Sequence, residues 1–310
     1  QKISVITPTW NRAHVVARAI DSVIAQTYPA HELIVVDDGS TDDTVAVIES
    51  RYAEQIEKGW LVLVKNEHGG ISKTRNGGLE RASGDLVAYL DSDNHWHPEF
   101  LRLMATPFAE CEALGTAYCA EHIQDLDKGT EHILGVTYQR ENLIRRNFID
   151  LNCFVHRRSI VAQQGMFDEA ITRLVDWDLI IRHTQFAPPA YVPVSLVEYY
   201  LDKKNLKNVT HTEKWDNNFR HVAWKYRRER AKYGIDPLRI AYVVWDWPAL
   251  SQTFVMNELR WLVSNGFDVR VYYKILAETP AELDFPIEAR QVANVEDLSA
   301  ALIDDRRNVM

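Results

Sequence analysis

Two aspartates in the stretch LDSDN, Asp91 and Asp93, have a type and spacing that suit metal chemistry. They follow an apolar run, so both carboxylates can turn into one pocket if the chain curls at Ser92. Two neighbouring negative charges in a cleft repel each other and favour a cation between them. Oxygen ligands suit Mg²⁺ or Mn²⁺, which also bind phosphates and water. The pair therefore predicts a divalent-cation site, with an acidic turn that holds no metal as the alternative.

Two further stretches place polar residues where a nucleotide could bind. In VVDDGSTDD, Asp38 follows an apolar run, and its carboxylate either completes a turn or hydrogen-bonds a nucleobase or ribose. In HGGISKTRNGG, Arg75 lies between two glycine pairs and either reaches a diphosphate or base or lies on the surface. This stretch is not a P-loop, because Ser72 stands where the motif requires glycine before the lysine.

A third group of carboxylates is Asp176 and Asp178 in the stretch VDWDL. Acidic residues at the start of a helix are stabilised by the helix dipole, which is one explanation for both. The other is that one of them is a general base, which must approach the proton that it removes. His95 and His97 follow LDSDN directly, and we interpret them as loop residues before Pro98.

These residues lie between segments that alternate regularly. Apolar runs predict strands, helical spacing of apolar residues predicts helices, and Ser40 is expected to cap the second helix. Strands separated by helices imply right-handed βαβ units in an α/β fold with a parallel sheet, where ligands bind beyond the carboxyl ends of the strands. The predicted strands are 2–8, 31–38, 60–66, 85–93, 114–127, 152–158 and 189–201, and the predicted helices are 12–27, 40–54, 71–82, 100–113, 139–147, 175–186 and 212–233.

The composition limits the class of protein. A formal net charge of -9 argues against a nucleic-acid partner. Three cysteines without a C-x-x-C spacing favour free thiols and a cytoplasmic protein, and no apolar run is long enough to span a bilayer. Residues 233–237 form a predicted linker, after which 238–245, 251–266 and 267–274 predict one more βαβ unit, with Gly266 closing its helix.

Several architectures place carboxylates at strand ends. A phosphotransfer receiver domain has about half this length, and the lysine that it needs after a fifth strand is not evident. A dehydrogenase requires G-x-G-x-x-G after its first strand, and a sugar nucleotidyltransferase requires a glycine-rich basic loop there, whereas this chain has TPTWNRAH. A module that binds a nucleotide-sugar without catalysis stays open as an alternative.

Taken together, the motifs resemble glycosyltransferase family 2, the inverting enzymes of the GT-A fold. The stretches that carry the resemblance are ISVITPTWNR, AIDSVIAQTY, ELIVVDDGSTDDT, KTRNGGLERASGDLVAYLDSDN, HPEFL, GMFDE and DWDL, over about residues 2–233. The resemblance implies a GT-A domain at 1–235, with a mixed, mostly parallel sheet covered by helices on both faces. It implies transfer of a hexose from a UDP-sugar to a hydroxyl of a glycan or lipid-linked acceptor, in bacterial surface polysaccharide or glycan assembly.

The resemblance also assigns roles to individual residues. It places Asp93 on a Mn²⁺ or Mg²⁺ ion, with Asp91 beside it and nearer the ribose, and it suggests His211 as a further metal or diphosphate ligand. Asp176 is the implied catalytic base, although Val175 replaces the acidic residue that usually precedes it, which leaves a supporting carboxylate in doubt. The implied donor-binding residues are Thr7, Pro8 and Thr9 at the uracil, with Arg12, Asp38, Arg75, Asp91 and Ser92.

The last part of the chain, 236–310, resembles the opening βαβ segment of GT-B enzymes of glycosyltransferase family 4. Those enzymes need a second Rossmann domain to bind a donor, so we expect this segment to be catalytically silent and to begin a second transferase domain of a longer protein. A lipid-linked acceptor would bring the protein to the inner face of the membrane as a peripheral protein.

Overall fold

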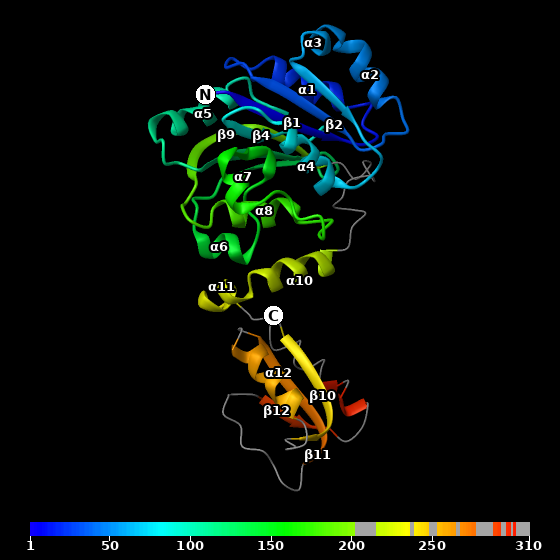
Figure 1. Cartoon of the computed structure of the whole chain (residues 1–310), viewed down its shortest axis with the longest axis vertical. Coiled ribbons are helices and arrows are strands. Elements are labelled where there is room, and N and C mark those ends of the chain that lie inside the picture. The colour runs from blue at the N-terminus through cyan, green and yellow to red at the C-terminus, as the bar shows by residue number, and fades with distance from the viewer. Residues whose placement is uncertain are drawn as a thin grey trace. The chain divides into compact units, whose positions relative to one another are not determined.

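The computed structural model describes residues 1–201, 215–235, 239–247, 253–264, 267–276, 288–292, 296–298 and 300–301. The chain divides into two compact units, Gln1–Phe219 and Arg220–Met310, which we describe separately (Figure 1).

The first unit begins with alternating strands and helices, as the apolar pattern predicts. Its strands β1, β2, β3 and β4 pair in parallel in the order β3-β2-β1-β4, so that the carboxyl ends of β1, β2 and β4 lie at one edge. The elements are β1 Ile3–Thr9, α1 Val16–Ile24, β2 Glu32–Asp37, α2 Thr44–Arg51, α3 Ala53–Glu57, β3 Leu61–Lys65, α4 Ile71–Arg81 and β4 Leu86–Tyr89.

The second half of this unit extends the same sheet with strands of both directions. The full order is β3-β2-β1-β4-β8-β6-β9-β5, with β7 on β6; β8 is antiparallel to β4 and β6, whereas β9 is parallel to β6. The elements are β5 His95–Trp96, α5 Phe100–Glu110, β6 Thr116–Asp125, β7 Thr130–Leu134, α6 Arg140–Arg145, the 3₁₀ turn η1 Leu151–Cys153, β8 Phe154–Arg157, α7 Ser159–Gln164, α8 Val175–His183 and β9 Ala190–Leu201. This mixed α/β architecture is consistent with a GT-A fold.

Helices cover both faces of the sheet, as Figure 1 shows, with α1 on one face and α4, α7 and α8 on the other. Alternate residues of a strand point to opposite faces, so β1 serves both layers. Ile3 and Val5 belong to the large core that includes Ile20 of α1 and Phe100 of α5. Ile6 points the other way, against α4.

The contact between α4 and β1 depends on Gly78. A Cβ at this position would lie 2.5 Å from Ile6 Cγ2, closer than real Cβ contacts come. We expect Gly78→Ala to lower the free energy of unfolding by about 1–3 kcal/mol through overpacking, despite the better helix propensity of alanine. Gly77→Ala is the matched control, because its nearest neighbour would be 3.7 Å away, and we expect no loss there. Urea denaturation of both variants checks this, and equal stability would contradict the packing argument.

Two local predictions were wrong. Ser40 does not cap the second helix, because α2 begins only at Thr44; the Ser40 hydroxyl instead donates to Asp37 and accepts from the backbone N–H of Asn11 at 2.8 Å. The single helix predicted for 212–233 is two helices, α10 Trp215–Lys225 and α11 Arg227–Lys232, since the backbone leaves helical geometry at Tyr226.

The second unit contains a three-stranded parallel sheet in the order β10-β11-β12. Its elements are β10 Arg239–Trp247, α12 Thr253–Ser264, β11 Asp268–Leu276 and β12 Glu288–Gln291. The predicted strand–helix–strand order is therefore present, and Leu259 and Val271 are buried in its core. Gly266, the predicted helix end, and residues 236–237 of the predicted linker lie outside the described residues. Among the described residues, no helix is long and apolar enough to cross a membrane.

Candidate active site

A cavity of about 550 Å³ lies beyond the carboxyl ends of β1, β2 and β4. It brings together residues from seven separate parts of the sequence. The predicted site residues that line it are Pro8, Thr9, Arg12, Asp38, Arg75, Asp91, Ser92, Asp93 and Asp176. Thr7 does not line the cavity: it is fully buried within β1, paired with Val35 of β2. His211 lies outside the described residues, so its role stays a prediction.

Asp38 fixes the loop that precedes α4. Its Oδ1 accepts from Gly69 N at 2.8 Å and its Oδ2 from Gly70 N at 3.1 Å, while His68 Nδ1 lies 2.8 Å from Oδ2. The His68 ring stacks on Trp10, with centroids 4.6 Å apart and planes 20° apart. Both rings line the cavity, so Asp38 positions part of its wall as well as offering a carboxylate to a ligand.

Arg75 joins α4 to the carboxylates beyond β4. Its side chain is buried, and its Nη2 donates to Asp91 Oδ1 at 2.7 Å. Among the described residues no group accepts from its Nε. Burial alone would lower the pKa of Arg75, but Asp91, Asp176 and Asp150 together raise it above its ordinary value. The guanidinium is therefore a fixed positive charge with a donor to spare.

Asp93 is surrounded by arginines from the first βα unit. Its Oδ2 lies 3.8 Å from Arg12 Nε, and its backbone carbonyl accepts from Arg18. Burial raises the pKa of Asp93, and the negative charge of Asp91 raises it further, only partly offset by Arg12. A further positive charge near Asp93, in addition to Arg12 and Arg18, would favour its ionised form.

These two carboxylates fit a divalent cation of the Mg²⁺ or Mn²⁺ kind. Such an ion is usually held by one or two carboxylates and completes its shell with substrate phosphates and water. Asp91 and Asp93 both line the cavity, so both can offer carboxylate oxygens to such an ion. Within the part of the chain that the structure describes, no third His, Cys, Asp or Glu joins them.

Asp176 reaches the cavity from the start of α8. Leu174, two residues before Asp176, has left-handed backbone angles (φ 63°, ψ 23°). This turn directs the first residues of the helix toward the cavity. Asn147 Nδ2 donates to Asp176 Oδ2 at 2.7 Å. Burial raises the pKa of Asp176, with Arg75 as the main opposing charge. A carboxylate with a raised pKa, facing a cavity, suits a general base.

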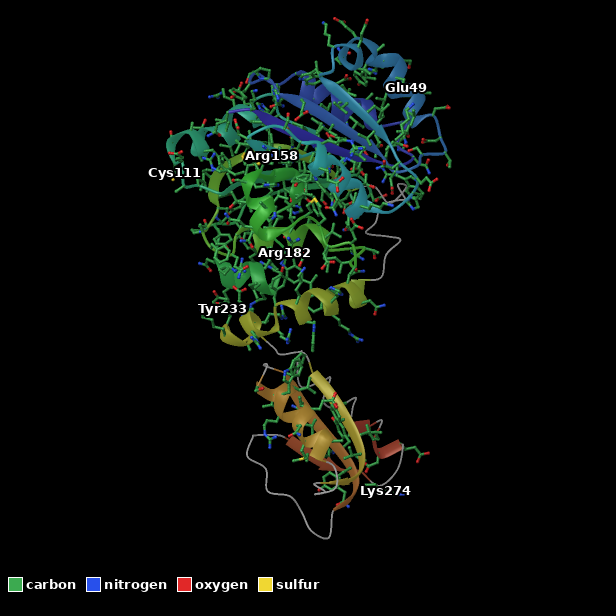
Figure 2. All side chains as sticks on the ribbon, in the orientation of Figure 1. Glu49, Cys111, Arg158, Arg182, Tyr233 and Lys274 are labelled. Carbon is green, nitrogen blue, oxygen red and sulfur yellow. The ribbon has the colours of Figure 1, made fainter. Side chains whose placement is uncertain are left out.

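The structure separates Asp176 from the second candidate, Asp178. Asp178 is fully buried, does not line the cavity, and forms an ion pair with Arg182 at 2.9 Å. Arg182, labelled in Figure 2, also donates to the carbonyl of Met166 at 2.8 Å. Trp177 is a core residue whose Nε1 donates to Leu143 O at 2.6 Å. Of the acidic pair, only Asp176 is placed for chemistry.

Several residues of the site were not predicted. Asp150 and Tyr199 line the cavity, and Asn147 and Asn152 hold the carboxylates of Asp176 and Asp91. The sequence sign of Asn147, Asp150 and Asn152 is the run NFIDLN, where three polar residues interrupt an apolar stretch directly before a strand; Tyr199 lies outside this run. His95 was predicted to be a loop residue, but it lies in β5, where its ring stacks on Tyr200, and it does not line the cavity.

Glu121 is a buried acid behind this site. The side chain of Glu121 has one hydrogen-bonding neighbour among the described residues, the Cys153 thiol at 4.0 Å. Burial, and then the charges of Asp150 and Asp176, raise the pKa of Glu121 to about 9. The folded protein therefore keeps this proton at neutral pH, whereas the unfolded chain loses it above about pH 4.5.

This difference predicts that Glu121→Gln raises the free energy of unfolding relative to wild type by an amount that depends on pH. As the pH rises from 5 to 8, the wild-type protein loses stability at about 1.4 kcal/mol per unit from this residue, and the variant does not. We expect the variant to gain on the order of 4 kcal/mol relative to wild type over that range. Denaturant unfolding at pH 5, 6.5 and 8 measures it, with Glu110→Gln on the exposed end of α5 as the control. Parallel pH profiles for wild type and Glu121→Gln would show the side chain to be ionised when folded.

Comparison with known families places the chain among sugar transferases. The sequence model described as Glycosyl transferase family 2 matches residues 4–163. An uncharacterized glycosyltransferase of a Nostoc species is 35% identical over 41% of this chain and 39% of its own length. The uncharacterized glycosyltransferase YibD of Escherichia coli is 26% identical over 89% of this chain and 90% of its own. Chondroitin synthase of Pasteurella multocida is 24% identical over 76% of this chain, which spans 24% of that protein.

Solved structures agree on the fold. Residues 1–349 of Staphylococcus aureus TarS in complex with UDP-GlcNAc superpose with a TM-score of 0.59 and 20% identity, over 75% of this chain and 66% of that one. The mannosyltransferase PcManGT of Pyrobaculum calidifontis, in complex with GDP-Man and Mn²⁺, gives a TM-score of 0.51 and 20% identity, over 75% and 61%.

Proposed function

The chain belongs to glycosyl transferase family 2, and we propose that it transfers a sugar, with inversion, from a UDP-sugar to a hydroxyl of a glycan or lipid-linked acceptor. The observation that carries the proposal is the single cavity that Arg75, Asp91, Asp93 and Asp176 all line. An acidic pair beside an arginine suits a nucleoside diphosphate with a cation, and a separate carboxylate suits the removal of a proton.

The donor diphosphate is assigned to the side of Arg75 and Asp93. Arg75 is held by Asp91 and keeps its Nε available, so it can donate to an oxygen that becomes more negative as the bond to the sugar breaks. A divalent cation on Asp93, with Asp91 beside it, would supply Lewis-acid stabilisation of the same leaving group when bound. Pro8, Thr9 and the stacked rings of Trp10 and His68 form the wall assigned to the base.

Asp176 is assigned as the base. Inversion requires the acceptor oxygen to attack the anomeric carbon from the face opposite to the leaving diphosphate. The proton of the attacking hydroxyl passes to the Asp176 carboxylate, which Asn147 holds at 2.7 Å. The raised pKa of Asp176 makes it a stronger base than an exposed aspartate.

The nature of the relatives guides the choice of substrate. One structural neighbour was solved with UDP-GlcNAc and another with GDP-Man and Mn²⁺, so a nucleotide-sugar with a divalent ion is the donor class to test. A relative named chondroitin synthase supports a role in polysaccharide assembly. We also propose that residues 1–235 form the transferase domain and that 236–310 form a separate GT-B-like, family 4 segment.

The test is a panel of UDP-, GDP- and dTDP-sugars, each assayed with and without Mn²⁺ for release of the nucleotide and for thermal stabilisation of the protein. We expect one UDP-sugar to be hydrolysed slowly and to raise the melting temperature, in both cases only with the metal. Equal responses to all donors, or none, would contradict the proposal.

A further inference from the structure

The segment 147–152 connects the two halves of the cavity. It lies between α6 and β8 and contacts both assigned carboxylates. At one end, Asn147 donates to Asp176 at 2.7 Å. At the other, Asn152 donates to Asp91 Oδ2 at 3.2 Å and accepts from Asp91 N at 2.6 Å. Asp150 lies between these two contacts and lines the cavity, although the reaction proposed above gives it no role.

The carboxyl of Asp150 is fixed by one oxygen only. Its Oδ1 accepts from Asn152 N at 2.8 Å and from Asn152 Nδ2 at 2.6 Å. No donor among the described residues reaches its Oδ2. Because a carboxylate oxygen can accept two hydrogen bonds, the orientation of Asp150 is set while half of its capacity stays open to a ligand.

Tyr199 of β9 lines the same cavity beside Asp150. Burial raises the pKa of Tyr199 well above its ordinary value, and Asp150 is the largest of the charges that add to this effect. Within the described residues, its hydroxyl has no hydrogen-bond partner. An aromatic ring next to an oriented carboxyl matches a sugar, whose C–H face is apolar and whose edge carries hydroxyls.

We propose that Asp150 and Tyr199 form the acceptor subsite: Asp150 Oδ2 bonds a hydroxyl next to the one that attacks, and Tyr199 packs against the sugar ring. This inference rests on the proposed function and adds the acceptor class, a neutral polyhydroxylated sugar. The carboxyls of Asp91, Asp150 and Asp176 would repel a phosphate or uronate in the same place.

The experiment compares Asp150→Asn with wild type on p-nitrophenyl glycosides of glucose, galactose and N-acetylglucosamine, using the donor found above. The amide oxygen can still accept both bonds from Asn152, so the fold and the contact with Asp91 are kept. We expect the KM for the acceptor to rise about 30-fold, with kcat within about threefold of wild type, because one hydrogen bond to a charged group is lost. In the absence of acceptor, the variant should hydrolyse the donor slowly in water at a rate within about twofold of the wild-type rate.

Monodeoxy acceptors identify the hydroxyl that Asp150 contacts. For wild type, removal of one hydroxyl next to the attacking one should cost about as much as the Asp150→Asn substitution, and the variant should not distinguish that analogue from the parent sugar. Asp125→Asn is the control, because Asp125 Oδ1 accepts from Lys128 N at 3.0 Å in a comparable turn, but Asp125 does not line the cavity.

The possible outcomes separate this inference from the function beneath it. An unchanged acceptor KM in both Asp150→Asn and Asp150→Ala would overturn the subsite alone, as would a parallel fall in donor hydrolysis, which indicates a structural role. Better turnover of a glucuronide than of the glucoside would overturn the neutral acceptor class. A wild-type protein that turns over no nucleotide-sugar would overturn the proposed function, and the subsite with it.

Discussion

Asp176→Asn is expected to lower kcat for transfer by about 10³-fold, because the attacking hydroxyl loses the group that takes its proton. The substitution conserves shape, and Asn147 can still donate to the amide oxygen at this position. Binding of the donor should therefore be unchanged. Since burial disfavours the charge of Asp176, the melting temperature should stay equal or rise. Steady-state kinetics with calorimetric titration of UDP measure both quantities.

Asp178→Asn is the matched control, two residues later in the same helix. It breaks the ion pair between the fully buried Asp178 and the largely buried Arg182, so we expect a loss of about 3 kcal/mol in the free energy of unfolding. At a temperature where the variant is folded, its kcat should be close to that of wild type. If Asp176→Asn kept full activity with a good acceptor, Asp176 would not be the base.

Asp93→Ala has the second large expected effect, and it concerns binding. We expect the gain in UDP affinity that Mn²⁺ provides to fall by at least about 100-fold, because the ion loses a carboxylate ligand. Affinity for UDP without metal should change by less than about threefold, since Arg75 and the base pocket are intact. Titration of UDP with and without Mn²⁺ gives both values from one protein.

The stability of Asp93→Ala provides an independent check. The raised pKa of Asp93 indicates that its charge is unfavourable in the folded protein, so its removal should not lower the melting temperature in the absence of metal. Added Mn²⁺ with UDP should stabilise the wild type and not the variant. If both are stabilised to the same extent, Asp93 does not bind the ion.

The parallel half of the fold was predictable because its strands are short apolar runs that end in polar residues. Ile3–Thr9, Glu32–Asp37 and Leu86–Tyr89 each follow this pattern, and their common edge holds Asp38, Asp91 and Asp93 as expected. The antiparallel strands β5 and β7 were harder to predict from the sequence. β5 has two residues and β7 is largely exposed, so neither has an apolar pattern that periodicity could detect.

The candidate site likewise contains residues that the sequence could predict and residues that it could not. Arg75 and Asp176 stand in motifs of unusual composition, and both line the cavity. Asn152 and Asp91 are 61 positions apart, and no periodicity relates two residues that meet only across strands β4 and β8. Thr7 is the opposite case, since it belongs to a recognisable motif but is buried inside the sheet and does not line the cavity.

The backbone at Leu174 has a consequence for any attempt to improve this protein. A leucine in the left-handed region carries a cost of about 1–2 kcal/mol that glycine would not. Leu174→Gly is therefore an obvious substitution for raising the stability of the protein. Yet glycine would also allow the first turn of α8 more backbone conformations. The carboxylate of Asp176 would then be held in the cavity less firmly. At position 174, glycine is thus expected to favour stability, whereas leucine is expected to favour the correct position of the catalytic base.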